Sequence, residues 1–142
     1  RNKIKDIILI VQEEVARRIV ATEKSQSKQY GLLTILSQFW ADCEIIRLVG
    51  RKSFYPAPKV NSALVSLKVR KEPLLDLTDY SFFRRVIKAA FSQRRKTLKN
   101  CLVGAGFDKE KVTNAISKMN LDENIRGEEL SIREFGELAK ML

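Results

Sequence analysis

The sequence predicts a chain of the α+β class, with strands and helices up to about residue 72 and a small all-α part after it. Two observations predict this class. Short β-branched apolar runs lie in the first half of the chain, whereas apolar residues at helical spacing fill the second half. Between them, the proline-containing stretch KEPLLDLTD at 71–79 interrupts both patterns. We therefore expect one domain over residues 1–72 and a helical domain over residues 73–142.

The first four elements follow from local patterns. IILIV at 7–11 is a β-branched run that predicts a buried strand, and QEEVARRIVA at 12–21 has the apolar spacing of a helix. The polar stretch TEKSQSKQ at 22–29 is typical of a loop, and YGLLTILSQFW at 30–40 predicts a second, strongly apolar helix.

Two further strands are expected on either side of a proline-rich turn. CEIIRLVG at 43–50 and VNSALVSLKVR at 60–70 both have strand character. In the second run, Ala63, Val65 and Leu67 share one face. We expect the two strands to form an antiparallel pair at the end of a sheet.

The all-α part is predicted to begin with two helices. Thr78 or Asp79 is a suitable N-cap for a helix that runs to about Phe91. A second helix is expected from Arg94 to about Leu102.

Two more helices complete the prediction. GAGFD at 104–108 is expected to end one helix, and the next begins near Asp108. Ser131 and Glu134 form the capping-box pattern S-x-x-E ahead of a last helix. The two glycines of 104–108 do not indicate a phosphate loop, because no strand precedes them.

Composition limits the chemistry of the chain. Of its 142 residues 44% are hydrophobic, enough for a folded core, and no apolar run approaches the roughly 18 residues of a membrane span. There is no histidine, which excludes a hydrolytic triad, and Cys43 and Cys101 are expected to be reduced thiols with no metal site. The chain begins at Arg1 rather than Met, so we expect a fragment of a longer protein.

Positive charge is concentrated in the first part of the chain. The net charge is +10, and the first 99 residues carry +12 whereas the remaining 43 carry −2. The cations are densest from Arg84 to Lys99, where seven basic residues occur with no acid. A merely solvated helix usually mixes signs at i±3 and i±4. The segregation therefore predicts a surface for a polyanion, with nucleic acid as the first candidate and a membrane surface as the second.

In a single helix, several of these cations would share one face. Arg84, Lys88, Arg95 and Lys99 would fall within a sector of about 60°, with the apolar residues on the opposite arc. A break near Ser92 would preserve the segregation within each part.

The turn FYPAPKVNS at 54–62 is stiff. Pro56 and Pro58 fix φ at about −65° and bias the residues before them toward extended backbone. The pattern leaves two interpretations of Phe54, which either packs under the sheet or is presented to a ligand at small entropic cost.

Five segments in order resemble the small-subunit ribosomal RNA adenine dimethyltransferases: VQEEVARRI, SKQYGLLTILSQF, FYPAPKVNSALVSL, AFSQRRKTLKN and RGEELSIREF. They extend from residue 11 to residue 135. The signature F-x-P-x-P-K-V-x-S at 54–62 is shared with the erythromycin-resistance methylases of large-subunit RNA. QRRKT at 93–97 favours the small-subunit enzymes.

The resemblance implies the last strands and helices of a Rossmann-like methyltransferase sheet over residues 1–72, followed by an RNA-binding helical domain. It implies that Phe54 stacks against a flipped target adenine. It also implies that a missing N-terminal part binds the methyl donor S-adenosylmethionine, because the glycine-rich loop, the ribose-binding acid and the N-L-P-Y motif of the family are absent from this chain. The cations expected on the RNA backbone are Lys59, Arg84, Arg85, Lys88, Arg94, Arg95, Lys96 and Lys99.

For the whole protein, the resemblance implies dimethylation of adjacent adenosines near the 3′ end of small-subunit ribosomal RNA in ribosome biogenesis. We expect a cytoplasmic monomer that acts on a pre-30S-type particle, with no membrane or metal partner, and we expect this chain alone to be inactive. Two alternatives stay open: a non-catalytic RNA-binding ribosome-assembly factor, and a resistance methylase that acts on large-subunit RNA.

Overall fold

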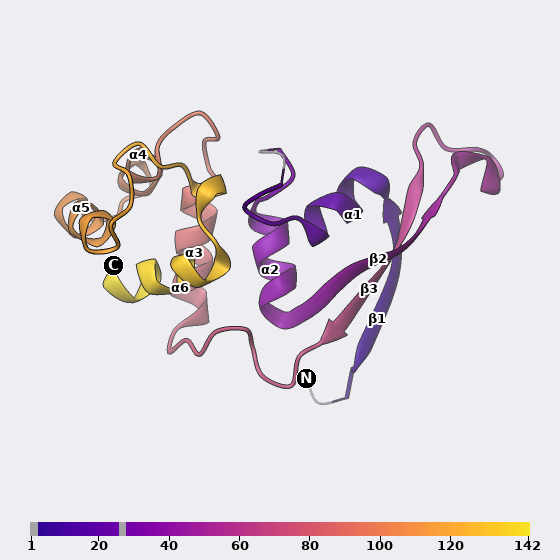
Figure 1. Cartoon of the computed structure of the whole chain (residues 1–142), viewed down its shortest axis with the longest axis horizontal. Helices are drawn as coiled ribbons and strands as arrows, with labels where there is room; N and C mark the ends of the chain where they lie inside the picture. Colours follow the sequence, from indigo (N-terminus) through magenta and orange to yellow (C-terminus); the bar gives the residue numbers. More distant parts are fainter. Residues whose placement is uncertain (1–2, 26–27) are drawn as a thin grey trace. The chain divides into compact units, whose positions relative to one another are not determined.

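The chain divides into two units, Arg1–Leu74 and Leu75–Leu142. The computed structural model of the protein describes residues 3–25 and 28–142. Within these residues the first unit contains three strands and two α-helices, and the second contains four α-helices (Figure 1). The mixed α/β content predicted from the sequence is confirmed.

A small antiparallel sheet organises the first unit. Its strands are β1 (Asp6–Gln12), β2 (Ala41–Val49) and β3 (Ser62–Val69), in the spatial order β1-β3-β2. β3 is antiparallel to both neighbours, so the predicted antiparallel pair is confirmed. A β-bulge between Ile45 and Arg47 interrupts the register of β2 against β3.

The core of this unit lies between the sheet and α1 (Glu13–Val20). Its buried members are Ala16, Ile19, Ala63 and Val65. Because Ala63 and Val65 are two residues apart on β3, their side chains point to the same face of the sheet. The predicted alternation of β3 therefore places its small apolar residues against the helix.

The second helix of the unit, α2 (Leu32–Trp40), caps the end of α1 through side chains. The hydroxyl of Thr34 donates to the Arg18 carbonyl at 2.6 Å. Gln38 Nε2 donates to the carbonyls of Ile19 at 2.9 Å and Ala21 at 2.8 Å. These bonds satisfy carbonyl groups that have no partner inside α1.

β1 is exposed, and the prediction that IILIV forms a buried strand is wrong for this chain. The relative exposures of Ile8 and Ile10 are 61% and 60%, and those of Ile7 and Leu9 are 36% and 40%. The physical reason is that β1 lies at the edge of the described sheet, pairs with β3 alone, and has an apolar sequence on both faces.

The connection from β2 to β3 forms a projecting end of the hairpin (Figure 1). After Gly50 the chain makes one turn of 3-10 helix, η1 (Arg51–Ser53), and then runs through residues 54–61 into β3. We call residues 50–61 the hairpin tip.

The second unit is a helical bundle. Its α-helices are α3 (Tyr80–Ala90), α4 (Leu98–Gly104), α5 (Lys109–Lys118) and α6 (Ile132–Met141), with a short 3-10 turn, η2 (Gly127–Glu129), before α6. Its largest fully buried side chains are Phe83, Val86, Ile87, Leu98, Leu102, Leu130, Phe135 and Leu138. No helix in the described part of either unit is long and apolar enough to span a membrane.

Three of the predicted helix ends are confirmed. Asp79 caps α3 by accepting from the Phe82 N–H at 2.9 Å. Ser131 and Glu134 form the predicted capping box, since Ser131 Oγ accepts from the Glu134 N–H at 3.2 Å and Glu134 Oε2 accepts from the Ser131 N–H at 2.7 Å. After α4, Gly106 takes φ +90°, a left-handed conformation that favours glycine.

The predicted start of the second helix of this unit is wrong. α4 begins at Leu98 rather than Arg94, because Thr97 acts as its N-cap and accepts from the Asn100 N–H at 3.3 Å. Residues 91–97 form turns between α3 and α4. The predicted basic stretch is therefore split between a helix and a loop, and its cations do not share one helical sector.

Candidate nucleic-acid interface

Phe54 follows η1 at the hairpin tip and is half-buried. Its backbone is extended, with φ −119° and ψ 150°, and its N–H donates to the Arg51 carbonyl at 3.4 Å. The ring is therefore neither sealed in the hydrophobic core nor fully in solvent. This placement is compatible with a ring that rests on the protein with one side and meets a ligand with the other.

Asn61 ties the hairpin tip to the start of α1. Its side-chain oxygen accepts from the Arg51 N–H at 3.1 Å, and its carbonyl accepts from the Glu13 N–H at 3.0 Å. Glu13 in turn binds Arg17, whose Nη2 lies 2.6 Å from Glu13 Oε1. The hydrogen bond from Arg17 holds the pKa of the Glu13 carboxyl below its usual value.

A cavity of about 720 Å³ opens between the first turn of α1 and the hairpin tip. Glu14 and Arg17 line it from the helix, and Arg51 and Lys59 line it from the tip. The cavity therefore has carboxylates from α1 and cations from both α1 and the hairpin tip.

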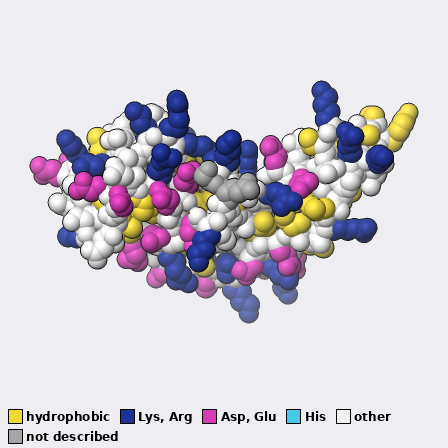
Figure 2. Space-filling view, turned by 45° about the horizontal axis from the view of Figure 1, so that its top comes forward, with side chains coloured by type: hydrophobic (Ala, Val, Ile, Leu, Met, Phe, Trp, Pro, Cys, Tyr) yellow, Lys and Arg dark blue, Asp and Glu magenta, His cyan; other side chains and the backbone are white. Residues whose placement is uncertain are grey.

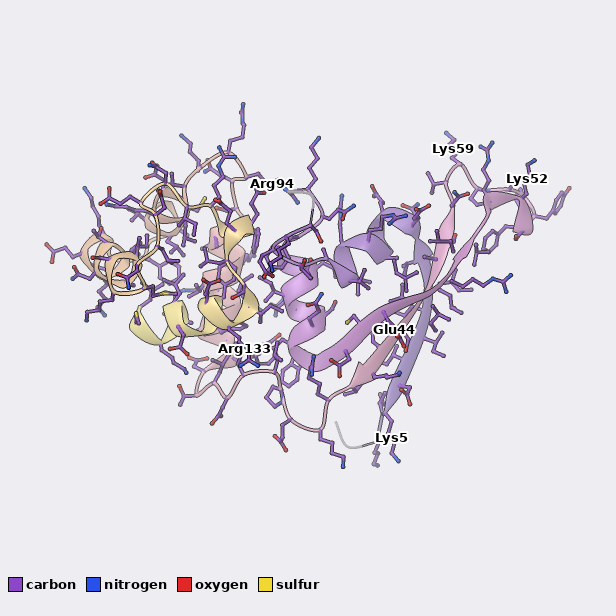
Figure 3. All side chains as sticks on the ribbon, in the orientation of Figure 1. Lys5, Glu44, Lys52, Lys59, Arg94 and Arg133 are labelled. Carbon is purple, nitrogen blue, oxygen red and sulfur yellow. The ribbon has the colours of Figure 1, made fainter. Side chains whose placement is uncertain are left out.

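The hairpin tip carries more positive charge than we predicted. Lys59 was expected to bind RNA and is exposed, and Lys52 stands with it at the outer end of the hairpin (Figure 3). Arg51 is exposed on the same tip. The sequence contained a signal for this cluster, because residues 45–71 include seven Lys and Arg and no Asp or Glu.

Three of the predicted RNA ligands lie on α3. Arg84, Arg85 and Lys88 are exposed, while the other side of the helix is buried. Arg85 has an additional role, since its guanidinium carbon lies 4.8 Å from the centroid of the Phe107 ring and 5.3 Å from that of Phe82. These distances are typical of cation–π contacts.

The remaining predicted ligands lie on and beside the loop that follows α3. Arg94, Arg95 and Lys96 are all exposed there, and Figure 3 labels Arg94 on this loop. Lys99, in the first turn of α4, is half-buried and lines a cavity of about 450 Å³ beside α5. In Figure 2, Lys and Arg side chains stand out from the surfaces of both units.

The model of the ribosomal RNA adenine dimethylase family matches residues 1–142. The chain belongs to this family. Two of its relatives are proteins named ribosomal RNA small subunit methyltransferase A. The one from Syntrophotalea carbinolica is 40% identical over 142 residues, and the one from Caldanaerobacter subterraneus is 42% identical over 139 residues. The chain spans about half the length of these relatives, 53% and 51% respectively.

Two solved structures share the fold of this dimethylase-family chain. A dimethyladenosine transferase from Plasmodium falciparum superimposes with a TM-score of 0.78 at 23% identity, over 97% of this chain and 57% of that one. The 23S rRNA methyltransferase ErmE superimposes with a TM-score of 0.64 at 21% identity, over 97% of this chain and 55% of that one. The mixed α/β fold is therefore that of the dimethyladenosine transferases.

The two thiols of this family member belong to different units. Cys43 is half-buried on β2, and Cys101 is buried on α4, where its Sγ lies 3.4 Å from the Gln93 carbonyl oxygen. Both are free in the structure. Over residues 3–25 and 28–142, no group of three or more His, Cys, Asp or Glu side chains is arranged to hold a metal ion.

Proposed function

We propose that the whole protein is an S-adenosylmethionine-dependent methyltransferase that dimethylates adjacent adenosines near the 3′ end of small-subunit ribosomal RNA. The family match over all 142 residues carries this proposal. Within it, the first unit supplies part of the methyltransferase core and the second unit binds RNA. The partner is a pre-30S-type particle in ribosome biogenesis, and the protein acts in the cytoplasm as a monomer.

In this function Phe54 is the stacking surface for the flipped target adenine. Its half-buried ring stands on a segment that two prolines stiffen and that Asn61 anchors. Stacking a base on an aromatic ring contributes about 1–3 kcal/mol, comparable with the cost of unstacking that base from its neighbours. Because the segment is already ordered, little of this energy is lost in fixing it.

The cofactor site of the proposed enzyme lies in a part of the protein outside this chain. The chain has no glycine-rich loop of the G-x-G-x-G type and no N-L-P-Y motif, and it spans about half of its relatives. β1 offers a place for the missing part of the core, because its free edge and the exposed Ile8 and Ile10 are what a strand inside a larger sheet would bury. S-adenosylmethionine supplies the methyl group when bound there.

The second unit binds the RNA backbone through its cations. Arg84 and Lys88 on α3, together with Arg95 and Lys96 on the following loop, are exposed and make no ion pair with any described residue. Uncompensated cations of this kind repel one another until phosphates neutralise them, and each phosphate contact releases counterions. The proposed binding is therefore strongly salt-dependent.

Methylation of isolated ribosomal subunits by the full-length protein tests the proposal. We expect methyl transfer to small-subunit adenosines, with dimethyladenosine identified by mass spectrometry of digested RNA. Phe54→Ala should lower the rate by roughly 5- to 150-fold, the equivalent of about 1–3 kcal/mol, with RNA affinity nearly unchanged. Phe54→Tyr, which keeps a ring, should retain most of the rate.

Three outcomes would contradict the proposal. Methylation of the large subunit alone would indicate a resistance methylase. RNA binding without any methyl transfer would indicate a non-catalytic assembly factor. An unchanged rate in Phe54→Ala would remove Phe54 from the target pocket.

A further inference from the structure

Tyr55 is the one exposed aromatic residue among those that the structure describes. Its side chain is as open to solvent as in an extended peptide, with a relative exposure of 102%. Phe54, its neighbour on the hairpin tip, is half-buried. The Tyr55 ring buries no surface against the described part of the chain, so it is available to stack on a ligand.

Cations flank this ring in the sequence. Lys52 precedes it and Lys59 follows it, and both side chains stand at the outer end of the hairpin (Figure 3). Arg51 is exposed on η1, beside them in the chain. Neither Lys52 nor Lys59 forms an ion pair with any residue that the structure describes. Figure 2 shows hydrophobic atoms at this end of the unit with Lys and Arg side chains next to them.

The tip is held in shape before any ligand arrives. Ser53 donates its N–H to the Gly50 carbonyl at 3.0 Å, and Arg51 donates its N–H to the Asn61 side chain at 3.1 Å. Pro56 and Pro58 restrict the backbone on the other side of Tyr55. A ring on such a segment is presented with little ordering entropy still to be lost.

We propose that Tyr55 and the cations of the hairpin tip bind single-stranded RNA, with the Tyr55 ring stacking a base that flanks the target adenosine. This inference deepens the proposed function and rests on it for the identity of the polyanion as RNA. Exposed aromatic rings next to cations are the usual means by which proteins bind unpaired nucleotides.

Tyr55 takes a different base from the one on Phe54. Phe54 is half-buried whereas Tyr55 is fully exposed, so the two rings differ in the surface they offer to a ligand. We therefore assign them to different bases. A strand whose target base is on Phe54 would carry its neighbouring nucleotide to Tyr55, with phosphates near Lys52 and Lys59.

A nucleic acid fits the tip better than a lipid surface does. Membrane-surface binding draws on a broad apolar face. Within the hairpin tip, Val60 is the one other large hydrophobic side chain that is exposed, at 47%. A single aromatic ring flanked by cations can stack on one base while the cations contact the neighbouring phosphates.

The test measures binding of fluorescently labelled RNA dodecamers to the full-length protein by anisotropy at low salt. One dodecamer is oligoadenosine and the other has the same backbone with abasic sites. We expect the wild type to prefer the oligoadenosine by about fivefold or more, Tyr55→Phe to keep that preference, and Tyr55→Ala to lose most of it. Because Tyr55 is fully exposed, the substitution should leave the fold intact, which circular dichroism checks.

Two control variants distinguish the contribution of the Tyr55 ring from the contributions of neighbouring apolar surface and charge. Val60→Ala removes apolar surface from the same tip and should leave the preference for bases unchanged. Lys52→Gln removes one charge and should weaken binding to both dodecamers alike.

The inference is overturned if the wild type binds neither dodecamer, or if Tyr55→Ala keeps the full preference for the oligoadenosine. Binding to phosphatidylserine vesicles that depends on Tyr55, without any preference for bases, would overturn it in favour of a membrane surface. These readouts need no methyl transfer. The failure of this inference is therefore distinguishable from failure of the proposed enzyme activity, which is measured on ribosomal subunits.

Discussion

The guanidinium of Arg85 lies over the ring of Phe107, with 4.8 Å between the guanidinium carbon and the ring centroid. The contact joins α3 to the residue that precedes the N-cap of α5, and Phe82 adds a second ring at 5.3 Å. Phe82 and Phe107 also meet edge to face, with centroids 5.9 Å apart. One of the cations predicted to bind RNA is thus also part of the packing of the second unit.

Replacing Arg85 should therefore lower stability as well as charge. We expect Arg85→Ala to reduce the free energy of unfolding by about 0.5–1 kcal/mol, measured by urea denaturation of the 142-residue chain. Lys88→Ala removes the same charge one helical turn away and should change stability by less than about 0.5 kcal/mol. A double-mutant cycle with Phe107→Leu should show coupling, and strict additivity would exclude the contact in solution.

Cations on the loop after α3 should set the salt dependence of RNA binding. We expect Arg94→Ala/Arg95→Ala in the full-length protein to weaken binding and to reduce the slope of log K against log salt by about one to two. The matched control is Lys109→Ala/Lys118→Ala, which removes the same charge from α5, within the acidic last part of the chain. Equal affinity and equal slope for the double variant and the wild type would refute this assignment.

The backbone of Gly127 lies so close to α3 that a larger residue does not fit without a shift. A Cβ atom added there would lie 2.9 Å from the Ala90 carbonyl oxygen and 3.2 Å from the Ala90 Cβ. We expect Gly127→Ala to destabilise the chain by about 1–3 kcal/mol, because backbone must move to admit the methyl group. Gly104→Ala is the control, since a Cβ there meets nothing within 4 Å and α4 should gain up to about 1 kcal/mol. Similar effects of the two substitutions would contradict the packing of η2 on α3.

The Cys43 thiol should react slowly. Burial raises the pKa of this thiol from 9.0 to about 11, with Arg70 opposing the rise and Asp42 adding to it. At pH 8 the thiolate fraction is then about a hundredfold smaller than for an ordinary thiol, so iodoacetamide should modify Cys43 about a hundredfold more slowly in the folded chain than in urea. Alkylation followed by peptide mass spectrometry resolves Cys43 from Cys101, and equal rates in the two states would contradict the burial.

The raised pKa of Cys43 also makes the free energy of unfolding depend on pH. The folded-state pKa of Cys43 lies above its unfolded value, so its contribution to stability is complete below about pH 9 and is lost as the pH rises toward 11. Cys43→Ala should remove the part of the alkaline loss that belongs to this thiol, which urea titrations at pH 8 and pH 10.5 would show.

Local chemistry in the sequence predicted most of the element types and several of their ends. Asp79, Ser131 and Gly106 fix helix ends through their own side chains or backbone freedom, so neighbouring residues are enough to predict them. The start of α4 was missed because a basic, polar stretch has similar helical propensity on either side of Thr97. The hydroxyl of Thr97, which accepts from the Asn100 N–H, decides where the helix begins.

The family, the segregation of charge and the stiff aromatic turn were determined by the sequence alone, since each depends on residue identity and order. Only the tertiary structure decided that the apolar β1 lies at an open edge of the described sheet and that Arg85 contacts two aromatic rings. It also decided that Phe54 is half-buried while Tyr55 is fully exposed. The physical reason is that exposure and ring contacts depend on which distant segments arrive beside a residue. A local pattern predicts the face on which a side chain points, whereas the fold determines what covers that face.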